Sequence, residues 1–209
     1  MDFVQELHLN TWLELGIAIS VTILGIILAL KGKVKAFTSK KITKNWALHT
    51  QIHEGLTELR VLTDCARVQL IQFHNGEYFM DGVSMMKLSC THESLAKGVS
   101  SIAGSTTNIL ISLYASVIDK ILLDSTEINF VKDEKEGYYR SFLESANITC
   151  YIALPVKYKN LISGYLVIQW CSPQKHNKVI HNKEEFGKLM ESTRNQIQVH
   201  LNEQLRIRT

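Results

Sequence analysis

Hydrophobic residues form one long uncharged run near the N-terminus and shorter periodic patterns after it. Residues 15–30 contain no charged side chain, and Trp12 and Leu13 extend the apolar stretch toward the roughly 20 residues that span a bilayer. Trp12 also suits the membrane–water interface. We therefore expect a transmembrane helix at residues 12–31, the one stretch of the sequence that could cross a bilayer.

The charges on either side of this run predict its orientation. Three acidic residues and no Lys or Arg precede it, whereas six lysines follow it within residues 31–44. The positive-inside rule then places residues 1–11 outside the cytoplasm and the rest of the chain after the span inside. A cleaved signal peptide, the alternative, would need basic residues ahead of the apolar run. We expect a single-pass membrane protein with a cytoplasmic C-terminal domain, and hence the lipid bilayer as a partner.

The pattern after the lysines begins with a helix and two strands. Residues 42–66 carry apolar side chains at intervals that fall near one helical face. Residues 67–73 alternate between apolar and polar, as a half-buried strand does, and the Asn75-Gly76 pair that follows favours a hairpin turn. A second strand is expected at residues 83–90.

The remaining pattern alternates between helical and extended segments. Helices are expected at residues 94–103, 108–123 and 138–146, with a short strand at 127–131 and a charged loop between. Two β-rich runs, 148–158 and 161–170, are joined by a tight turn at Lys159-Asn160, and Pro155 predicts a bulge or an edge position in the first run. Asn182 is expected to cap a final helix whose first turn carries two glutamates. Strands and helices mixed around a single sheet predict an α+β fold.

Charge and cysteine usage narrow the classes of function. The net charge of +3 comes from the lysines after the apolar run, since residues 45–209 hold 17 basic and 17 acidic residues. A neutral domain without a basic stripe argues against nucleic acid as a partner. The four cysteines are expected to be reduced in the cytoplasm. None forms a C-x-x-C pair, so the spacing signals no zinc or redox site and we expect no metal.

Catalytic motifs are missing from the sequence. It contains no G-x-S-x-G, no P-loop and no H-E-x-x-H, so hydrolase and NTPase functions find no support. A thiol–imidazole pair between Cys90 and His92 or His74 is an open alternative, and His49 and His53 could pair on a metal but lack a clear third ligand. We expect no enzyme activity, no catalytic residue and no cofactor.

The last two strands carry a resemblance to a known family. The run 147–156 (NITCYIALPV), a turn, and then 164–168 (GYLVI) resembles the end of a GAF domain, where a short helix precedes an apolar strand ending in Pro-hydrophobic, a turn, and Gly with another apolar strand. PAS-like sensor domains share the architecture. The resemblance implies an antiparallel sheet flanked by helices, with a ligand pocket on one face. It also implies that the helices at 42–66 and 183–205 pack together and dimerise. The sequence lacks the NKFDE-like motif of cyclic-nucleotide-binding members and a chromophore-type Cys context.

These patterns divide the chain into successive parts. They are an extracytoplasmic N-terminus at 1–11, a transmembrane helix at 12–31, a basic juxtamembrane segment and connecting helix at 32–66, a GAF-like domain at 67–181, and a C-terminal helix at 182–209.

A cluster of polar residues near two strand ends is the candidate ligand site. Short His, Lys, Ser and Glu side chains at such places are what a small polar ligand would meet. Asn75, Gly76 and Thr91 are more simply interpreted as turn and cap residues. The candidate ligand-binding residues are His74, Glu77, Lys87, Ser89, His92 and Glu93.

Two functions fit these observations. The first is a membrane-anchored cytoplasmic module that binds a small ligand and regulates a partner protein, as a homodimer or higher homo-oligomer. The second is a non-enzymatic structural or interaction protein, phage or mobile-element encoded, that docks a partner or self-assembles at the membrane. A ligand-dependent rise in melting temperature would distinguish the first from the second.

Overall fold

The computed structural model describes residues 2–78, 80, 82, 84–172 and 182–208 of the 209-residue chain. Within these ranges the side chains of residues 2–16, 18, 32–43, 77 and 204–208 lie outside the description. Residues 173–181, at the end of the expected GAF-like domain, also lie outside it. The chain forms two compact units, Met1–Ala47 and Leu48–Thr209, which are described separately.

The first unit is helical. All described residues of this unit lie in helix α1 (Asp2–Thr63), which continues into the second unit. The large apolar side chains described between Ile17 and Leu30 are 43–64% exposed. Among the residues that the structure describes, no helix has a run both long enough and apolar enough to cross a membrane. The span expected at residues 12–31 therefore stays a prediction.

The second unit is built on one antiparallel sheet, which confirms the α+β class. Within its described residues the strand order is β3-β2-β1-β6-β5-β4, and each neighbouring pair is antiparallel. The strands are β1 (Arg67–Tyr78), β2 (Ser84–Leu95), β3 (Ile109–Leu110), β4 (Asn129–Phe130), β5 (Cys150–Tyr158) and β6 (Leu161–Trp170).

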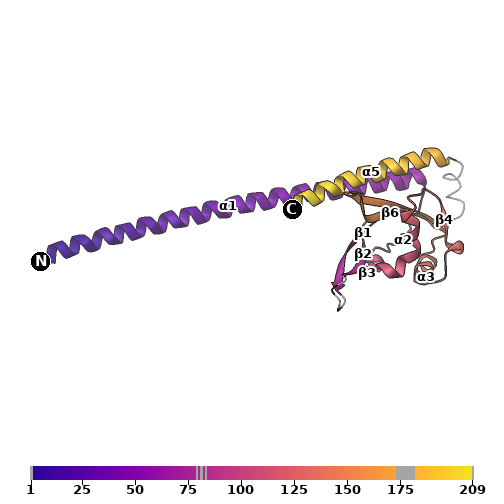
Figure 1. The fold of residues 1–209 in the computed structure, drawn as a ribbon. Helices are drawn as coiled ribbons and strands as arrows, with labels where there is room; N and C mark the ends of the chain where they lie inside the picture. The colour runs from indigo at the N-terminus through magenta and orange to yellow at the C-terminus, as the bar shows by residue number, and fades with distance from the viewer. Residues whose placement is uncertain (1, 79, 81, 83, 173–181, 209) are drawn as a thin grey trace. The chain divides into compact units, whose positions relative to one another are not determined.

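Helices cover both faces of this sheet (Figure 1). They are the end of α1, then α2 (Ala115–Leu122), α3 (Tyr138–Ser145) and α5 (Lys183–Arg208), with short 3-10 segments η1 (Gly104–Thr106), η2 (Ile111–Tyr114) and η3 (Val131–Asp133). The predicted helix at 94–103 is wrong, because β2 continues to Leu95 and an irregular segment follows it. The predicted helix at 108–123 divides into β3, η2 and α2.

Two apolar clusters hold the layers together. On one face, the end of α1 and α5 lie side by side and pack on the sheet, as the GAF resemblance implied for residues 42–66 and 183–205 (Figure 1). This cluster includes Ile52, Leu56, Leu59, Leu70, Leu154, Leu166, Met190, Ile197 and Leu201, all at most 4% exposed. The opposite face packs against α2 and α3 through a second cluster that includes Ile71, Leu88, Val117, Ile121, Leu143 and Val167.

The β1–β2 hairpin extends further than the sequence predicted. The Asn75-Gly76 turn is wrong, since both residues lie within β1 and Tyr78 still pairs with Ser84. Gly76 has a different role there. A Cβ at this position would lie 2.5 Å from the Met85 carbonyl oxygen and 2.8 Å from Lys87 Cδ, so the glycine allows β2 to approach closely here.

The β5–β6 hairpin matches its prediction. Lys159 and Asn160 have φ values of 48° and 65°, the left-handed pair that a tight two-residue turn needs. Strand β4 pairs only with Cys150 and Tyr151, so among the described strands β5 is paired at Pro155 with β6 alone and its other edge is open. A register shift follows between Val156 and Lys157. Beyond this point the Lys157 backbone N–H donates to Gln198 Oε1 of α5, 2.9 Å away.

Candidate ligand-binding face

The sheet face that packs against α2 and α3 carries three buried polar side chains of the central strands, Arg67, Gln69 and Gln169. Along β1, Val68 and Leu70 belong to the cluster beneath α1 and α5, whereas Ile71 belongs to the opposite cluster. Because side chains alternate along a strand, Gln69 and Arg67 share the face of Ile71. We call this surface the α2/α3 face.

Arg67 is a buried cation on this face, with 2% of its surface exposed. Its Nη1 donates to Gln169 Oε1 at 2.9 Å, and its Nη2 donates to the Ser100 carbonyl oxygen at 2.8 Å. Its Nε lies 3.4 Å from Glu93 Oε1, an ion-pair distance without hydrogen-bond geometry. Burial lowers the pKa of the guanidinium from its usual value, yet an arginine stays protonated in proteins. The α2/α3 face therefore holds a permanent positive charge.

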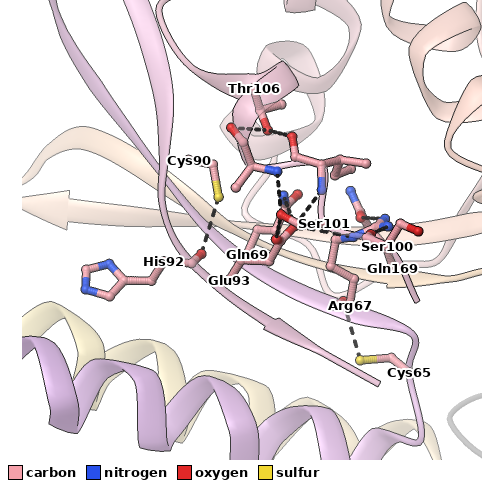
Figure 2. Close-up of polar contacts among 12 residues, drawn as sticks. Cys65, Arg67, Gln69, Cys90, His92, Glu93, Ser100, Ser101, Thr106 and Gln169 are labelled. Carbon is pink, nitrogen blue, oxygen red and sulfur yellow. Dashed lines mark hydrogen bonds and ion pairs between the residues drawn. The ribbon is translucent and has the colours of Figure 1, made fainter. Parts of the chain in front are cut away.

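Glu93 provides the matching anion, with a side chain 8% exposed. Its Oε1 accepts hydrogen bonds from Gln69 Nε2 at 2.9 Å and from the Ile102 backbone N–H at 3.2 Å. Its Oε2 accepts one from the Ser101 hydroxyl. Figure 2 shows these side chains converging beneath the chain that follows β2. We call Arg67, Gln69, Glu93 and Gln169 the quartet, and residues 100–102 the cover segment.

Strand register positions the quartet. Arg67 pairs with Gln169 across β1 and β6, and Gln69 pairs with Glu93 across β1 and β2. Directly opposite residues on one face of a sheet lie within reach of each other's side chains. Strands β1, β2 and β6 thus bring two amides, a cation and an anion to one place.

A second polar network lies on the same face. The Tyr151 hydroxyl donates to Glu134 Oε1 at 2.6 Å, and Lys120 Nζ contacts the same carboxylate oxygen and lies 3.0 Å from the Tyr151 hydroxyl oxygen. The Glu134 side chain is 1% exposed. Burial raises the pKa of the Tyr151 phenol, so the phenol stays a hydrogen-bond donor.

Tyrosine rings belong to the apolar cluster that contains Tyr151. Tyr114 and Tyr139 are tilted with ring centroids 4.9 Å apart, and Tyr139 meets Tyr151 edge-on at 5.7 Å. Tyr165 joins them from β6, and these four residues are at most 5% exposed. The chain's own rings fill this part of the face. A surface pocket of about 280 Å³ lies beside it, with Tyr138 and Tyr139 in its wall.

Three of the candidate residues chosen from the sequence lie together in the β1–β2 hairpin. His74 Nε2 lies 2.8 Å from Ser89 Oγ, which also accepts the Asn108 backbone N–H, and Lys87 is the register partner of His74. They alternate with Phe73, whose ring packs against the α2/α3 cluster, so they point to the other side of the sheet. The side chain of Glu77 lies outside the described residues.

His92 lies apart from both groups and contacts helix α1. Its Nε2 is 2.8 Å from His49 Nδ1 and the two rings stack with centroids 5.0 Å apart, while its Nδ1 lies 3.1 Å from the Thr91 hydroxyl. Burial, reinforced by His49 and His53, lowers the pKa of His92 to about 4. Among the described residues, no three His, Cys, Asp or Glu side chains converge as a metal site would need.

The lowered pKa predicts that acid destabilises the domain. The unfolded chain binds a proton at His92 near pH 6.5 and the folded chain only near pH 4, so stability is complete above this window and falls as pH drops through it. With solvent screening of the partly exposed ring, we expect a loss of about 1–2 kcal/mol. Urea unfolding at neutral pH and near pH 4.5 measures it. The variant His92→Gln should flatten the dependence while His200→Gln leaves it unchanged, and an equal slope in both variants would contradict the assignment.

Of the quartet, sequence reasoning found Glu93 and missed Arg67, Gln69 and Gln169. The alternation of side chains along residues 67–73 already indicated these buried polar residues. Arg67 and Gln69 share their strand face with Ile71 and Phe73, so polar and apolar residues mix on one side while the other side is apolar at Val68 and Leu70. Such mixing indicates a face that is buried and carries paired polar groups.

This chain is similar to known proteins in structure and not in sequence. No protein-family model and no curated protein matches the chain. Solved GAF domains do match: a phycocyanobilin-bound one from a cyanobacterial phytochrome (TM-score 0.54, 15% identity, 81% of this chain and 92% of that chain), a phycoerythrobilin-bound one from a cyanobacterial phytochrome (0.52, 12%, 84% and 95%), and one from Synechocystis in its photoproduct state (0.51, 18%, 77% and 98%). The chain has a GAF-like fold. The GAF resemblance seen in the sequence is confirmed at the level of fold.

The GAF-like domain does not fit the bilins that some of these solved domains carry. A bilin is an extended open-chain tetrapyrrole, whereas Tyr114, Tyr139, Tyr151 and Tyr165 occupy the α2/α3 face with rings in mutual contact. Cys90, a thiol on this face, donates to the His92 carbonyl oxygen, and burial raises its pKa to about 12. A thiol with so high a pKa is a poor nucleophile for attaching a chromophore.

Proposed function

We propose that this protein is a membrane-anchored cytoplasmic GAF-like module that binds a small polar ligand on its α2/α3 face and regulates a partner protein. The observation that carries the proposal is the buried Arg67–Glu93 pair, 2% and 8% exposed, on this face. Likeness to solved sensor-type GAF domains agrees with it at the level of fold.

The buried pair supports ligand binding because it is a poor stabilising device. Removing two charges from water costs several kcal/mol per ion, and well-packed apolar residues of similar volume stabilise a fold as well or better. A ligand site, in contrast, needs a few fixed polar groups within an apolar surround. Arg67 and Glu93 satisfy that need at the end of the aromatic cluster.

Membrane anchoring belongs to the proposal on the strength of the sequence. The uncharged run at residues 15–30 and the six lysines after it support a span with the N-terminus outside and the domain in the cytoplasm. The exposed apolar side chains of the first unit agree with a lipid-facing helix. A reporter fused after Thr209 that proved extracytoplasmic would overturn this orientation.

The proposed module acts without catalysis, through protein contacts. Self-association as a homodimer or higher homo-oligomer would use the paired ends of α1 and α5, with a protein partner receiving the signal and no role for nucleic acid. The alternative function, a docking or self-assembling protein at the membrane, shares the anchor and needs no ligand.

Native mass spectrometry tests the ligand. We expect the full chain, purified in mild detergent from the producing cells, to retain a bound small molecule that leaves on collisional activation. The variant Arg67→Lys should lose this molecule, since a lysine cannot reproduce the guanidinium fork. Arg140→Lys, at the pair with Glu144 on α3 and outside the quartet, is the matched control. An empty wild-type chain that co-purifies with a stable protein would favour the docking alternative.

A further inference from the structure

Polar groups of the cover segment form hydrogen bonds with the two charged residues of the quartet, Arg67 and Glu93. The Ser100 carbonyl oxygen accepts from Arg67 Nη2, while the Ser101 hydroxyl and the Ile102 N–H both donate to Glu93. The segment therefore offers an acceptor to the buried cation and two donors to the buried anion (Figure 2). A molecule with the same groups at the same spacing could take its place.

Arg67 has one further donor beside the one that Ser100 uses. In a guanidinium, Nε–H and one Nη2–H point in the same direction and form a fork that fits a carboxylate. Here Nη2 binds Ser100, and the buried Nε has no hydrogen-bond partner, lying 3.4 Å from Glu93 Oε1. A ligand carboxylate that took this fork would replace the Ser100 carbonyl oxygen at Nη2 and would lie beside Glu93.

The cover segment is a single stretch of irregular chain between the quartet and solvent. Ser100 and Ser101 are exposed on their outer side although the quartet beneath them is buried. The chain from Ala96 to Ala103 contains no helix or strand, and Gly98 within it has a φ of 82°, a conformation that favours glycine. Ile102 anchors the segment, because it packs against the α2/α3 cluster and its carbonyl oxygen accepts from Thr106, so local opening would begin at the exposed Ser100 and Ser101.

We propose that the quartet is a binding site for small zwitterions, with free α-amino acids as the ligand class, and that the cover segment occupies the site when the ligand is absent. This deepens the ligand-binding function proposed above and rests on it. The ligand carboxylate takes the Arg67 fork in place of the Ser100 carbonyl. The ligand ammonium binds Glu93 in place of the Ser101 hydroxyl and the Ile102 N–H. Gln69 and Gln169 are positioning residues that hold the two charged groups.

Charge balance selects a zwitterion over a simple ion. The Arg67–Glu93 pair is already neutral, so a lone carboxylate would leave an uncompensated negative charge beside Glu93, and a lone ammonium would leave a positive one beside Arg67. Buried uncompensated charge is strongly unfavourable. A molecule that carries both charges adds none, and each of its groups finds an opposite partner.

Thermal unfolding of the full chain with the standard L-amino acids tests the proposal. We expect at least one of them at millimolar concentration to raise the melting temperature, while acetate and methylamine, which carry only one of the two charges, do not. Isothermal titration then gives the affinity. A rise with acetate as large as with the amino acid would overturn the zwitterion assignment.

Two variants distinguish a ligand site from a structural cover. Ser101→Ala removes a hydrogen bond that exists only when the segment is closed, so the open form gains population and the amino acid should bind about tenfold more tightly. Ser145→Ala, which removes an exposed α3 hydroxyl bonded to the Phe142 carbonyl, should leave affinity unchanged. Glu93→Gln, checked for folding by circular dichroism, should weaken binding about tenfold or more.

The outcomes separate this inference from the proposed function. If native mass spectrometry retains a small molecule but no amino acid raises the melting temperature, the zwitterion assignment fails and the ligand-binding function stands. If neither method detects a ligand, both fail. If Ser101→Ala lowers the melting temperature without changing affinity for a bound amino acid, the cover segment is structural and does not compete for the site.

Discussion

Replacing Arg67 with methionine is expected to lower the free energy of unfolding by about 3–5 kcal/mol. Methionine fills much of the same space but leaves Glu93 buried without its cation, and it deprives Gln169 and the Ser100 carbonyl of a donor. Urea unfolding followed by tryptophan fluorescence measures the loss, since Trp170 is fully buried and changes environment on unfolding.

A double variant separates the unpaired charge from the lost packing. Arg67→Met with Glu93→Leu removes both charges and should recover most of the lost stability, because an apolar pair of similar volume replaces the ions. Lys188→Met, at the exposed pair with Glu184, should leave the unfolding midpoint nearly unchanged. If Arg67→Met cost no more than Lys188→Met, the Arg67–Glu93 pair would be neither buried nor energetically coupled in solution.

Adding one methyl group at Gly164 should be about as damaging as removing the buried charge. A Cβ there would overlap the Ile71 carbonyl oxygen and lie 2.9 Å from Gln72 Cα, and both are backbone atoms of the central strand β1 that cannot move aside. We expect Gly164→Ala to cost about 3 kcal/mol or more, at the upper end of what overpacking causes. The β1–β6 pairing would have to separate locally.

Gly104 is the matched control for this change. A Cβ at Gly104 meets nothing within 4 Å and its φ is not in the left-handed region, so Gly104→Ala should leave stability almost unchanged. Amide hydrogen exchange adds a local measurement, since Gly164→Ala should lower protection in β1 and β6 first. Equal stability of the two variants would contradict the close strand approach.

Local pattern was sufficient for the second half of the sheet. The run 161–170 is β6 to the residue, because its apolar β-branched composition and the left-handed Lys159-Asn160 turn both act within a few positions. The helices at each end were also predictable from their periodicity. The helix expected at 94–103 does not form: Ser94 and Leu95 belong to β2, where Ser94 contacts Thr57 and Arg60 of α1, and Gly98 has a φ of 82°, which lies outside the helical region.

The site depended on register, which the sequence pattern does not contain. Arg67 meets Gln169 across 102 positions, and Gln69 meets Glu93 across 24. The order β2-β1-β6 that joins them follows from which strands become neighbours, and alternation within one strand gives no information on that. His74, Lys87 and Ser89 lie close together in the β1–β2 hairpin, yet the register irregularity between Leu70 and Ile71 places them on the other side of the sheet from Glu93.

The hydrogen bond between the Lys157 N–H and Gln198 limits the addition of another strand to the edge of β5. After Tyr151, the edge of β5 that faces away from β6 is not paired with β4. A strand from another molecule could add to such an open edge, which is how amyloid-like stacking begins. Pro155 offers no N–H to an incoming strand, and the N–H of Lys157 is already taken by the Gln198 amide of α5. The final helix thus protects part of this open edge, and we expect a chain shortened before α5 to aggregate more readily than the full chain.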